Sequence, residues 1–402
     1  MLLSVAEAER IVLETVPPLP AEDCPLASAL GRVLREPILA DRDLPPCDRV
    51  TLDGIAVRHA AWLAGRREFR CEAIQPAGTK QRTLADPDAC LEIMTGAELP
   101  VGCDTVIPYE ELVLADGVAR VKTGAAPVRG QGIHQCGSDA TAGGTLVPAG
   151  ARVMAREIGS AAAVGCSTLR VALRPRMAVV TTGDELVAVD QQPERHQLRR
   201  SNEHALCAAL QSGGGGAADR FHLRDLEHEI AAALRRLTAE YDWLVLCGGV
   251  SKGRFDFLPR VLEELHVTQH FHGVSQRPGK PFWYGTTRRA TPVFALPGNP
   301  VSALICLRRY VLPALETALG AGSAPAQFVA LAADIERHPT FTRFISARLA
   351  SEASDARVWA WPAPTNTSGD FAGLAGSDGF AELPPGNETG TKGTIARFWR
   401  WD

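Results

Sequence analysis

The chain lacks the features that point to a membrane or a nucleic acid. No apolar run reaches membrane-spanning length, no block of basic residues occurs, and the formal net charge is −4. We therefore expect no membrane and no nucleic acid among its partners. The N-terminal segment carries acidic side chains where a signal peptide needs an apolar core, which favours a cytoplasmic location.

The 10 cysteines lack the spacing of a metal or redox motif. No Cys-x-x-Cys pair and no Cys/His cluster at zinc spacing occurs, and Cys207, Cys247 and Cys306 lie in apolar surroundings. This pattern suits a reducing compartment, with the cysteines as packing residues. With 402 residues, 46% of them apolar, the chain is long enough for about two to four domains with separate cores.

Turn signals divide the first half of the chain. Ser4 and Glu7 form a capping-box pattern ahead of a helix, and a second short helix is predicted at 26–33. Segments 1–41 and 146–174 are expected to form one discontinuous, helical linker and dimerisation domain. Between them, 42–145 alternates short β-type runs with Gly, Pro and Asp turns, which predicts an inserted small β domain.

Strands and helices alternate from 175 to 322. Strands are predicted at 177–181, 243–246 and 293–296, and helices at 201–210, from Asp225, and at 301–319 with a kink at Pro313. This alternation predicts a doubly wound, mostly parallel α/β domain. Residues 323–402 return to short strands with turns and are expected to form a C-terminal β domain. The predicted fold class is thus multidomain, α/β plus β.

Polar loops follow the predicted parallel strands, where such sheets bind ligands. They are Thr182-Gly183-Asp184-Glu185, Gly248-Gly249-Val250-Ser251 and Pro297-Gly298-Asn299-Pro300. A fourth loop, Arg277-Pro278-Gly279-Lys280-Pro281, adds two cations. We expect the four loops to form one pocket with acids on one side and anion-binding groups on the other. Such a pocket suits phosphoryl or nucleotidyl chemistry around a divalent metal.

Simpler structural roles remain open for each loop by itself. Glycine amides at Gly248 and Gly249 can bind an anion, Ser251 can donate a hydroxyl proton, and Asp256 can hold a cation. The same glycines could form only a tight turn, with Asp256 as a helix cap. The acids after Gly183 could lie in a solvated turn, and the Pro297 loop could only start a helix.

The four loops together resemble those of molybdopterin molybdenumtransferases of the bacterial MoeA type, related to the gephyrin E domain. The matching stretches are 182–186, 248–256, 277–281 and 296–302. The resemblance covers essentially the whole chain, since the β segment adds three further motifs: Leu52-Asp53-Gly54-Ile55-Ala56-Val57, Ile93-Met94-Thr95-Gly96-Ala97 and Gly137-Ser138-Asp139.

The resemblance implies insertion of molybdate into adenylylated molybdopterin, with Mg²⁺-dependent hydrolysis of the adenylate and release of AMP. It also implies a molybdopterin-binding α/β domain at 175–322, a β-barrel-like C-terminal domain at 323–402, and a homodimer. In that dimer Asp53, Thr95 and Asp139 would reach the pocket of the other subunit. A molybdopterin adenylyltransferase and the recipient molybdoenzymes are implied as further partners.

Residue roles carry over from the resemblance position by position. Catalytic roles are implied for Asp53, Asp139, Glu185, Asp225 and Asp256, of which Glu185, Asp225 and Asp256 would hold Mg²⁺. Substrate binding is implied for Thr95, Gly248, Gly249, Ser251, Arg277, Lys280, Pro297, Gly298, Asn299 and Ser368.

Several positions depart from the family pattern. The family's F-D-N-S-A-M-D-G-Y is replaced by a stretch containing Arg49, Val50 and Ile55, and its acid before Ser201 is replaced by Arg200. Leu226 replaces a second Asp after Asp225, and two family arginines are replaced by Phe341 and Ser346, with Arg343 and Arg348 close enough in sequence to substitute.

These departures keep alternatives to catalysis open. The chain could be a divergent, non-catalytic paralogue that binds molybdopterin or its nucleotide as a carrier or assembly partner. A nucleotide-binding domain for unrelated small molecules would require the ordered loop matches to be coincidental.

Overall fold

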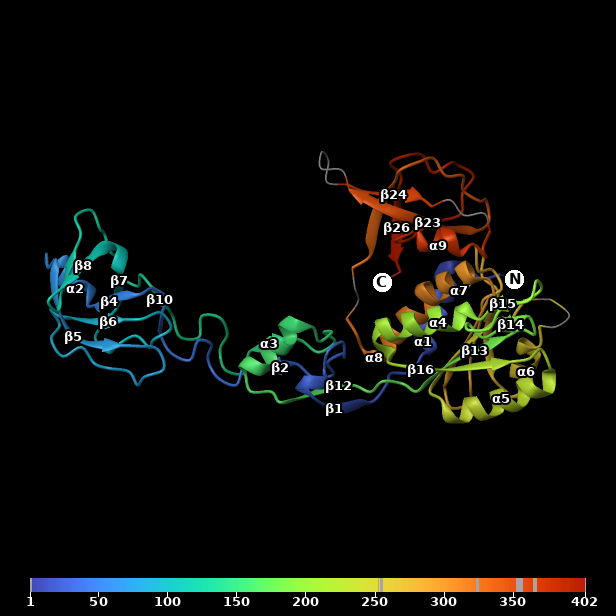
Figure 1. Cartoon of the computed structure of the whole chain (residues 1–402), viewed down its shortest axis with the longest axis horizontal. Helices are drawn as coiled ribbons and strands as arrows, with labels where there is room; N and C mark the ends of the chain where they lie inside the picture. Colours follow the sequence, from blue (N-terminus) through green and yellow to red (C-terminus); the bar gives the residue numbers. More distant parts are fainter. Residues whose placement is uncertain are drawn as a thin grey trace.

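The computed structural model describes residues 2–251, 253, 256–322, 325–351, 357–363 and 367–401. The molecule is elongated, with a small β module at one end, a narrow connecting region, and an α/β body with a C-terminal β domain at the other end (Figure 1). None of the described helices combines the length and apolar character needed to cross a lipid bilayer.

The connecting region is built from segments far apart in the sequence. Strand β1 (Ala21–Pro25) pairs with β12 (Thr168–Ala172), and β2 (Ile38–Leu39) pairs with β11 (Thr145–Val147), both antiparallel. Helix α3 (Ala155–Ala163) packs over these strands. The helix predicted at 26–33 is wrong: only a 3-10 turn forms at Leu26–Ser28, and Gly31 has φ of +76°, which ends helical geometry.

The β module has a six-stranded sheet in the order β7-β4-β6-β5-β9-β8. Gly54 is required in β4, because a Cβ atom there would overlap the carbonyl oxygen of Ile107 on the neighbouring strand. The elements of the module are β3 (Arg49–Val50), β4 (Gly54–Val57), α2 (His59–Leu63), β5 (Glu68–Gln75), β6 (Cys90–Ile93), β7 (Thr105–Pro108), the 3-10 turn Tyr109–Glu111, β8 (Leu112–Ala115), β9 (Val118–Val121) and β10 (Ile133–His134).

The α/β body contains a six-stranded sheet in the order β16-β13-β17-β21-β20-β18. The first four strands are parallel, and the last two are antiparallel to their neighbours. The strands are β13 (Met177–Thr182), β16 (Ala218–Leu223), β17 (Trp243–Cys247), β18 (Thr268–His272), β20 (Trp283–Thr286) and β21 (Pro292–Leu296). The carboxyl ends of β13, β17 and β21 therefore lie at one edge of the sheet.

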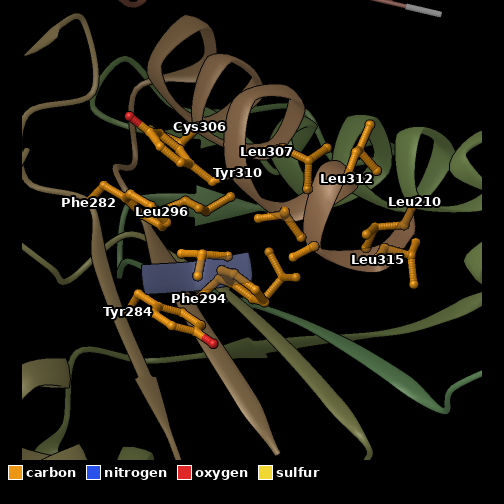
Figure 2. Close-up of a cluster of buried hydrophobic side chains, with 14 of the residues drawn as sticks. Leu210, Phe282, Tyr284, Phe294, Leu296, Cys306, Leu307, Tyr310, Leu312 and Leu315 are labelled. Atoms are coloured by element: carbon orange, nitrogen blue, oxygen red, sulfur yellow. The ribbon is translucent and has the colours of Figure 1, made fainter. Parts of the chain in front are cut away.

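Helices cover both faces of this sheet. Along β17, Trp243 and Val245 face one apolar core, and Leu244 and Leu246 face the other. The first core contains α1 (Val5–Thr15), α4 (Ser201–Leu210), α7 (Pro300–Cys306) and α8 (Leu312–Leu319), and part of it is shown in Figure 2. The second contains α5 (Glu227–Glu240) and α6 (Leu258–Glu264). The predicted doubly wound, mostly parallel sheet is confirmed.

The long helix predicted at 301–319 is interrupted. Helix α7 ends at Cys306, a π-helical turn covers Leu307–Val311, and α8 starts at Leu312. Pro313 lacks the N–H group that would bond to the carbonyl of residue 309, and its ring crowds that carbonyl. The π-helical turn thus lies just before Pro313, where the proline prevents regular α-helical hydrogen bonding.

The C-terminal strands close into a barrel. Hydrogen bonding runs from β23 through β24, β22, β26 and β25 back to β23, so the predicted β-barrel-like domain is confirmed. The elements are β22 (Gln327–Leu331), β23 (Thr342–Ser351), β24 (Val358–Pro362), α9 (Phe371–Ala375), β25 (Gly379–Leu383) and β26 (Ile395–Arg400). Strand β19 (Gln276–Arg277) of the α/β body adds to β23 in parallel and joins the two parts.

A buried arginine also connects these parts. The side chain of Arg309 is 2% exposed, donates to the carboxylate of Glu9 on α1 (2.9 Å), and donates to Glu382 on β25 (3.1 Å). A buried guanidinium is tolerated only when charged partners satisfy it. This cluster therefore helps to fix the barrel against the α/β body.

Candidate active site

A cleft of about 860 Å³ lies where β13, β17 and β21 end. Thr182 and Cys247 are the last residues of β13 and β17, and the short parallel pair β14 (Leu186–Val187) and β15 (Leu198–Arg199) borders the cleft. Nine of the predicted site residues line it: Glu185, Asp225, Gly248, Gly249, Ser251, Asp256, Pro297, Gly298 and Asn299.

One wall of this cleft is acidic. Partial burial raises the pKa of Asp225, and the neighbouring carboxylates of Asp184, Glu185 and Asp256 raise it further. A hydrogen bond from the Asp184 backbone opposes this shift in part. The backbone N–H of Asp225 in turn donates to the Asp184 carboxylate (3.3 Å). The wall therefore holds negative charge that a bound cation would relieve.

Asp256 shapes its own loop. Its carboxylate accepts a hydrogen bond from the backbone N–H of Gly253 (2.6 Å). Helix α6 starts at Leu258, and its N-cap, Phe257, makes no side-chain cap bond. Asp256 thus does not act as the N-cap of α6, and it keeps a carboxylate at the cleft.

The Gly248-Gly249 turn requires glycine. Gly248 has φ of +98° and Gly249 has φ of +59°, a region that residues with a side chain rarely adopt. A Cβ atom at Gly248 would lie 2.9 Å from the carbonyl oxygen of Thr182, and one at Gly249 would lie 3.0 Å from the Thr182 hydroxyl. The turn therefore lies directly against the end of β13.

Helix α4 holds the third loop of the cleft. The side-chain amide of Asn202, in its first turn, donates to the carbonyl oxygen of Gly298 (2.7 Å) and contacts the Cys247 sulfur (3.3 Å). Asn299 caps the start of α7 by position, with Pro300 at the first helical residue. This loop therefore both begins helix α7 and lines the cleft.

Magnesium fits the chemistry of the acidic wall. Glu185, Asp225 and Asp256 offer hard oxygen ligands in one cleft. Among the described residues, no group of three or more His, Cys, Asp or Glu side chains is already arranged to hold a metal. Mg²⁺ often takes only one or two carboxylates, with water and substrate phosphate completing its octahedron.

A second cleft, of about 850 Å³, lies between the α/β body and the barrel. Arg277, Lys280 and Ser368 line it, together with Arg337, His338 and Arg343. Two of these cations lie near one aromatic ring: the Cζ atom of Arg277 is 5.6 Å and the Nζ atom of Lys280 is 5.7 Å from the centre of the Phe341 ring. The second cleft is therefore cationic, in contrast to the acidic wall of the first.

The predicted loops line two adjoining clefts that share part of their walls, where the sequence predicts one pocket. Pairing of β19 with β23 draws the Arg277–Lys280 loop toward the barrel. Pro281, Pro297 and Asn299 line both clefts, and the Asn299 side chain donates to the Ser368 hydroxyl (2.7 Å) across the boundary.

The three predicted residues of the β module lie in the part of the molecule far from the clefts (Figure 1). The carboxylate of Asp53 accepts a hydrogen bond from the backbone N–H of Thr95 (2.6 Å), and this bond lowers the pKa of Asp53. Asp139 contacts the His134 ring (2.9 Å). Within one chain these residues do not line either cleft.

Sequence reasoning missed several lining residues. Arg200 and Asn202 line the first cleft, and Arg337 and His338 line the second. Arg200 directly precedes the predicted helix 201–210, and this position at a helix start was the sequence signal that could have identified it. Of the two candidate replacement arginines, Arg343 lines the second cleft, whereas Arg348 is exposed and lies opposite Trp361 on β24.

Fold and site together define a multidomain α/β protein with a cleft at the carboxyl ends of its parallel strands. Comparison with known families identifies the chain more closely. Residues 3–165 match the MoeA N-terminal region (domain I and II), 178–317 match a probable molybdopterin binding domain, and 329–401 match the MoeA C-terminal region (domain IV).

Two relatives and one solved structure match over nearly the whole length. The molybdopterin molybdenumtransferase of Synechocystis sp. is 39% identical, with 100% of each chain covered. That of Staphylococcus epidermidis is 28% identical over 98% of this chain and 94% of its own. The crystal structure of the molybdopterin biosynthesis MoeA protein from Pyrococcus horikosii has a TM-score of 0.81 at 28% identity, covering 100% of both chains.

The chain belongs to the MoeA family of molybdopterin molybdenumtransferases. This confirms the resemblance seen in the sequence. It also confirms the prediction of a transferase of molybdenum cofactor biosynthesis.

Proposed function

We propose that the chain inserts molybdate into the dithiolene of adenylylated molybdopterin, with Mg²⁺-dependent hydrolysis of the adenylate and release of AMP. The observation that carries this proposal is the junction of the two clefts along Pro281, Pro297 and Asn299. A pterin nucleotide with its metal needs acids and glycine amides, and an incoming oxyanion needs cations. Insertion requires the nucleotide site and the oxyanion site to be adjacent.

The first cleft would bind the pterin nucleotide. The amides of Gly248 and Gly249 and the hydroxyl of Ser251 would donate to phosphate oxygens, as glycine-rich turns at sheet edges do. Pro297 and Gly298 would form the floor, held in place by the Asn202 amide. These residues bind and orient the nucleotide.

Glu185, Asp225 and Asp256 would hold Mg²⁺ on the acidic wall. When bound, the ion would stabilise the charge that develops on the departing phosphate. The raised pKa of Asp225 supports this role, because crowded carboxylates favour a neutralising cation. The Gly253–Asp256 hydrogen bond orients one of the three carboxylates in advance.

The second cleft would hold molybdate. Arg277 and Lys280 supply positive charge, and Arg343 adds a third cation. Ser368 would contribute its hydroxyl, which is placed by the Asn299 amide. The molybdate would thereby wait beside the nucleotide rather than within the acidic cleft, where it would be repelled.

A homodimer would bring the β module to the site. Asp53, Thr95 and Asp139 lie far from the clefts in one chain, so a role at the site requires the module of one subunit to close over the cleft of its partner. Sedimentation velocity tests this arrangement, and a monomer at all concentrations would contradict it. The adenylyltransferase, the recipient molybdoenzymes and the cytoplasmic location remain predictions from the sequence.

Turnover by the purified protein tests the proposed function. Incubation with adenylylated molybdopterin, Mg²⁺ and molybdate should release AMP and yield cofactor that activates a molybdenum-free apoenzyme. Omission of molybdate, or chelation of Mg²⁺, serves as the control and should abolish formation of active cofactor. Tight binding of the nucleotide without AMP release would instead support a non-catalytic carrier.

A further inference from the structure

Arg200 is a cation on the wall of the first cleft, beside the start of helix α4. It is the N-cap residue of α4 and lines the cleft together with Ser201 and Asn202. Nearby carboxylates have other partners: Glu203 accepts from the Thr181 hydroxyl (3.2 Å), and Asp184 lies 3.6 Å from the Arg224 guanidinium. Among the described residues the Nε of Arg200 is buried without a hydrogen-bond partner.

The start of α4 and the Thr182 hydroxyl add further donors to this wall. Arg200 makes no side-chain cap bond, so the first N–H groups of α4 receive no acceptor from their N-cap. Thr182, also a lining residue, is 6% exposed, and within the described part of the chain its hydroxyl has no hydrogen-bond partner. The Thr181–Glu203 hydrogen bond holds the first turn of α4 against the end of β13.

Such a set of donors calls for an anion with several acceptor oxygens. A guanidinium binds two phosphate oxygens at once, and a helix N-terminus adds partial positive charge. Carboxylates elsewhere in the same cleft suit the counter-cation of a phosphate. An uncharged ligand would leave both the guanidinium and the acidic wall without a partner.

We propose that Arg200 binds phosphate oxygens of the nucleotide substrate at the N-terminus of α4. This inference rests on the proposed function and adds to it a substrate contact at a position where the resembling family carries an acid. Arg200 would bind the nucleotide and would take no direct part in hydrolysis of the adenylate.

Calorimetric titration of the full-length protein with AMP tests the contact, with adenosine as the phosphate-free probe. Arg200→Ala should weaken AMP binding about 10- to 100-fold, as expected for loss of a charged hydrogen bond, and leave adenosine binding unchanged. Arg200→Lys should restore part of the affinity, because it keeps the charge and loses the fork. Arg195→Ala changes an exposed arginine of the loop before β15 that does not line the cleft; it is the matched control and should bind AMP like the wild type.

Equal AMP affinity of Arg200→Ala and wild type would overturn the inference, and so would equal weakening of AMP and adenosine. If Arg200→Ala does not fold, Arg200→Gln keeps most of the side-chain length and carries the same comparison. The two proposals fail separately. A wild type that turns over but does not depend on Arg200 refutes this contact alone, whereas a wild type that neither binds nor releases AMP refutes both.

Discussion

The carboxylates of the α/β cleft and those of the β module occupy opposite environments. Burial and neighbouring acids raise the pKa of Asp225, whereas a hydrogen bond from the Thr95 amide lowers that of Asp53. The first group is held under repulsion, which a cation can relieve. The second is already satisfied within its own module. Acids of one kind can therefore mark a ligand site in one region and a stabilised turn in another.

The largest expected effect tests the charge on the cleft wall. Asp256→Asn should lower turnover at least about 100-fold, because a metal ligand is lost while the amide oxygen can still accept from Gly253. The AMP-release assay measures this effect. Asp190→Asn, on an exposed residue that does not line the cleft, is the control. Full activity of Asp256→Asn would remove Asp256 from the metal site.

A glycine substitution tests whether the cleft depends on the close approach of its loops. Gly248→Ala should destabilise the protein by about 1–3 kcal/mol, because φ is +98° and the new Cβ would lie 2.9 Å from the Thr182 carbonyl oxygen. Denaturant unfolding measures the change. Gly117→Ala in the β module, with φ of +73° and open space around it, should cost less. Equal costs would show that backbone conformation alone sets the requirement.

The pH dependence of stability distinguishes the two groups of acids directly. A raised folded-state pKa means that ionised Asp225 opposes folding, so Asp225→Asn should raise Tm at pH 7. The gain should shrink as pH falls through the raised folded-state pKa and should be lost below the ordinary Asp value of 3.8, where the wild-type carboxyl is protonated in both states. Added Mg²⁺ should raise Tm more in the wild type than in the variant. A loss of Tm at pH 7 would contradict the repulsion.

The smallest effect is expected in the β module. The lowered pKa of Asp53 means that its carboxylate supports folding above pH 3.8 and that this support is lost as pH falls through the folded-state pKa. Asp53→Asn keeps an acceptor for Thr95, so Tm at pH 7 should fall slightly and turnover by no more than about tenfold. A loss as large as that of Asp256→Asn would place Asp53 among the groups that contact the reacting atoms.

Much of the α/β body could be predicted because its signals are local. Helix α4 begins and ends where the periodic pattern does, and β17 differs from the expected strand only by Cys247. The capping box at Ser4 and Glu7 also forms. Buried strands and capped helices depend on consecutive residues, which a sequence displays directly.

The features that were missed depend on contacts between distant segments. The division into two clefts follows from the pairing of Arg277 with Arg343 across β19 and β23, which no local pattern encodes. The choice of Arg343 over Arg348 follows from the alternation of side chains along β23. Arg200 shows the same dependence: its place before α4 can be predicted locally, but its position on the cleft wall depends on how α4 packs beside β13 and β17.

The wall shared by the two clefts has a mechanical consequence. Pro297 and Asn299 border both spaces, and the bond between Asn299 and Ser368 ties that wall to the barrel. If a ligand in one cleft displaced this segment, it would alter the room left in the other cleft. Each ligand would then change the affinity of the other by the same factor, as thermodynamic linkage requires.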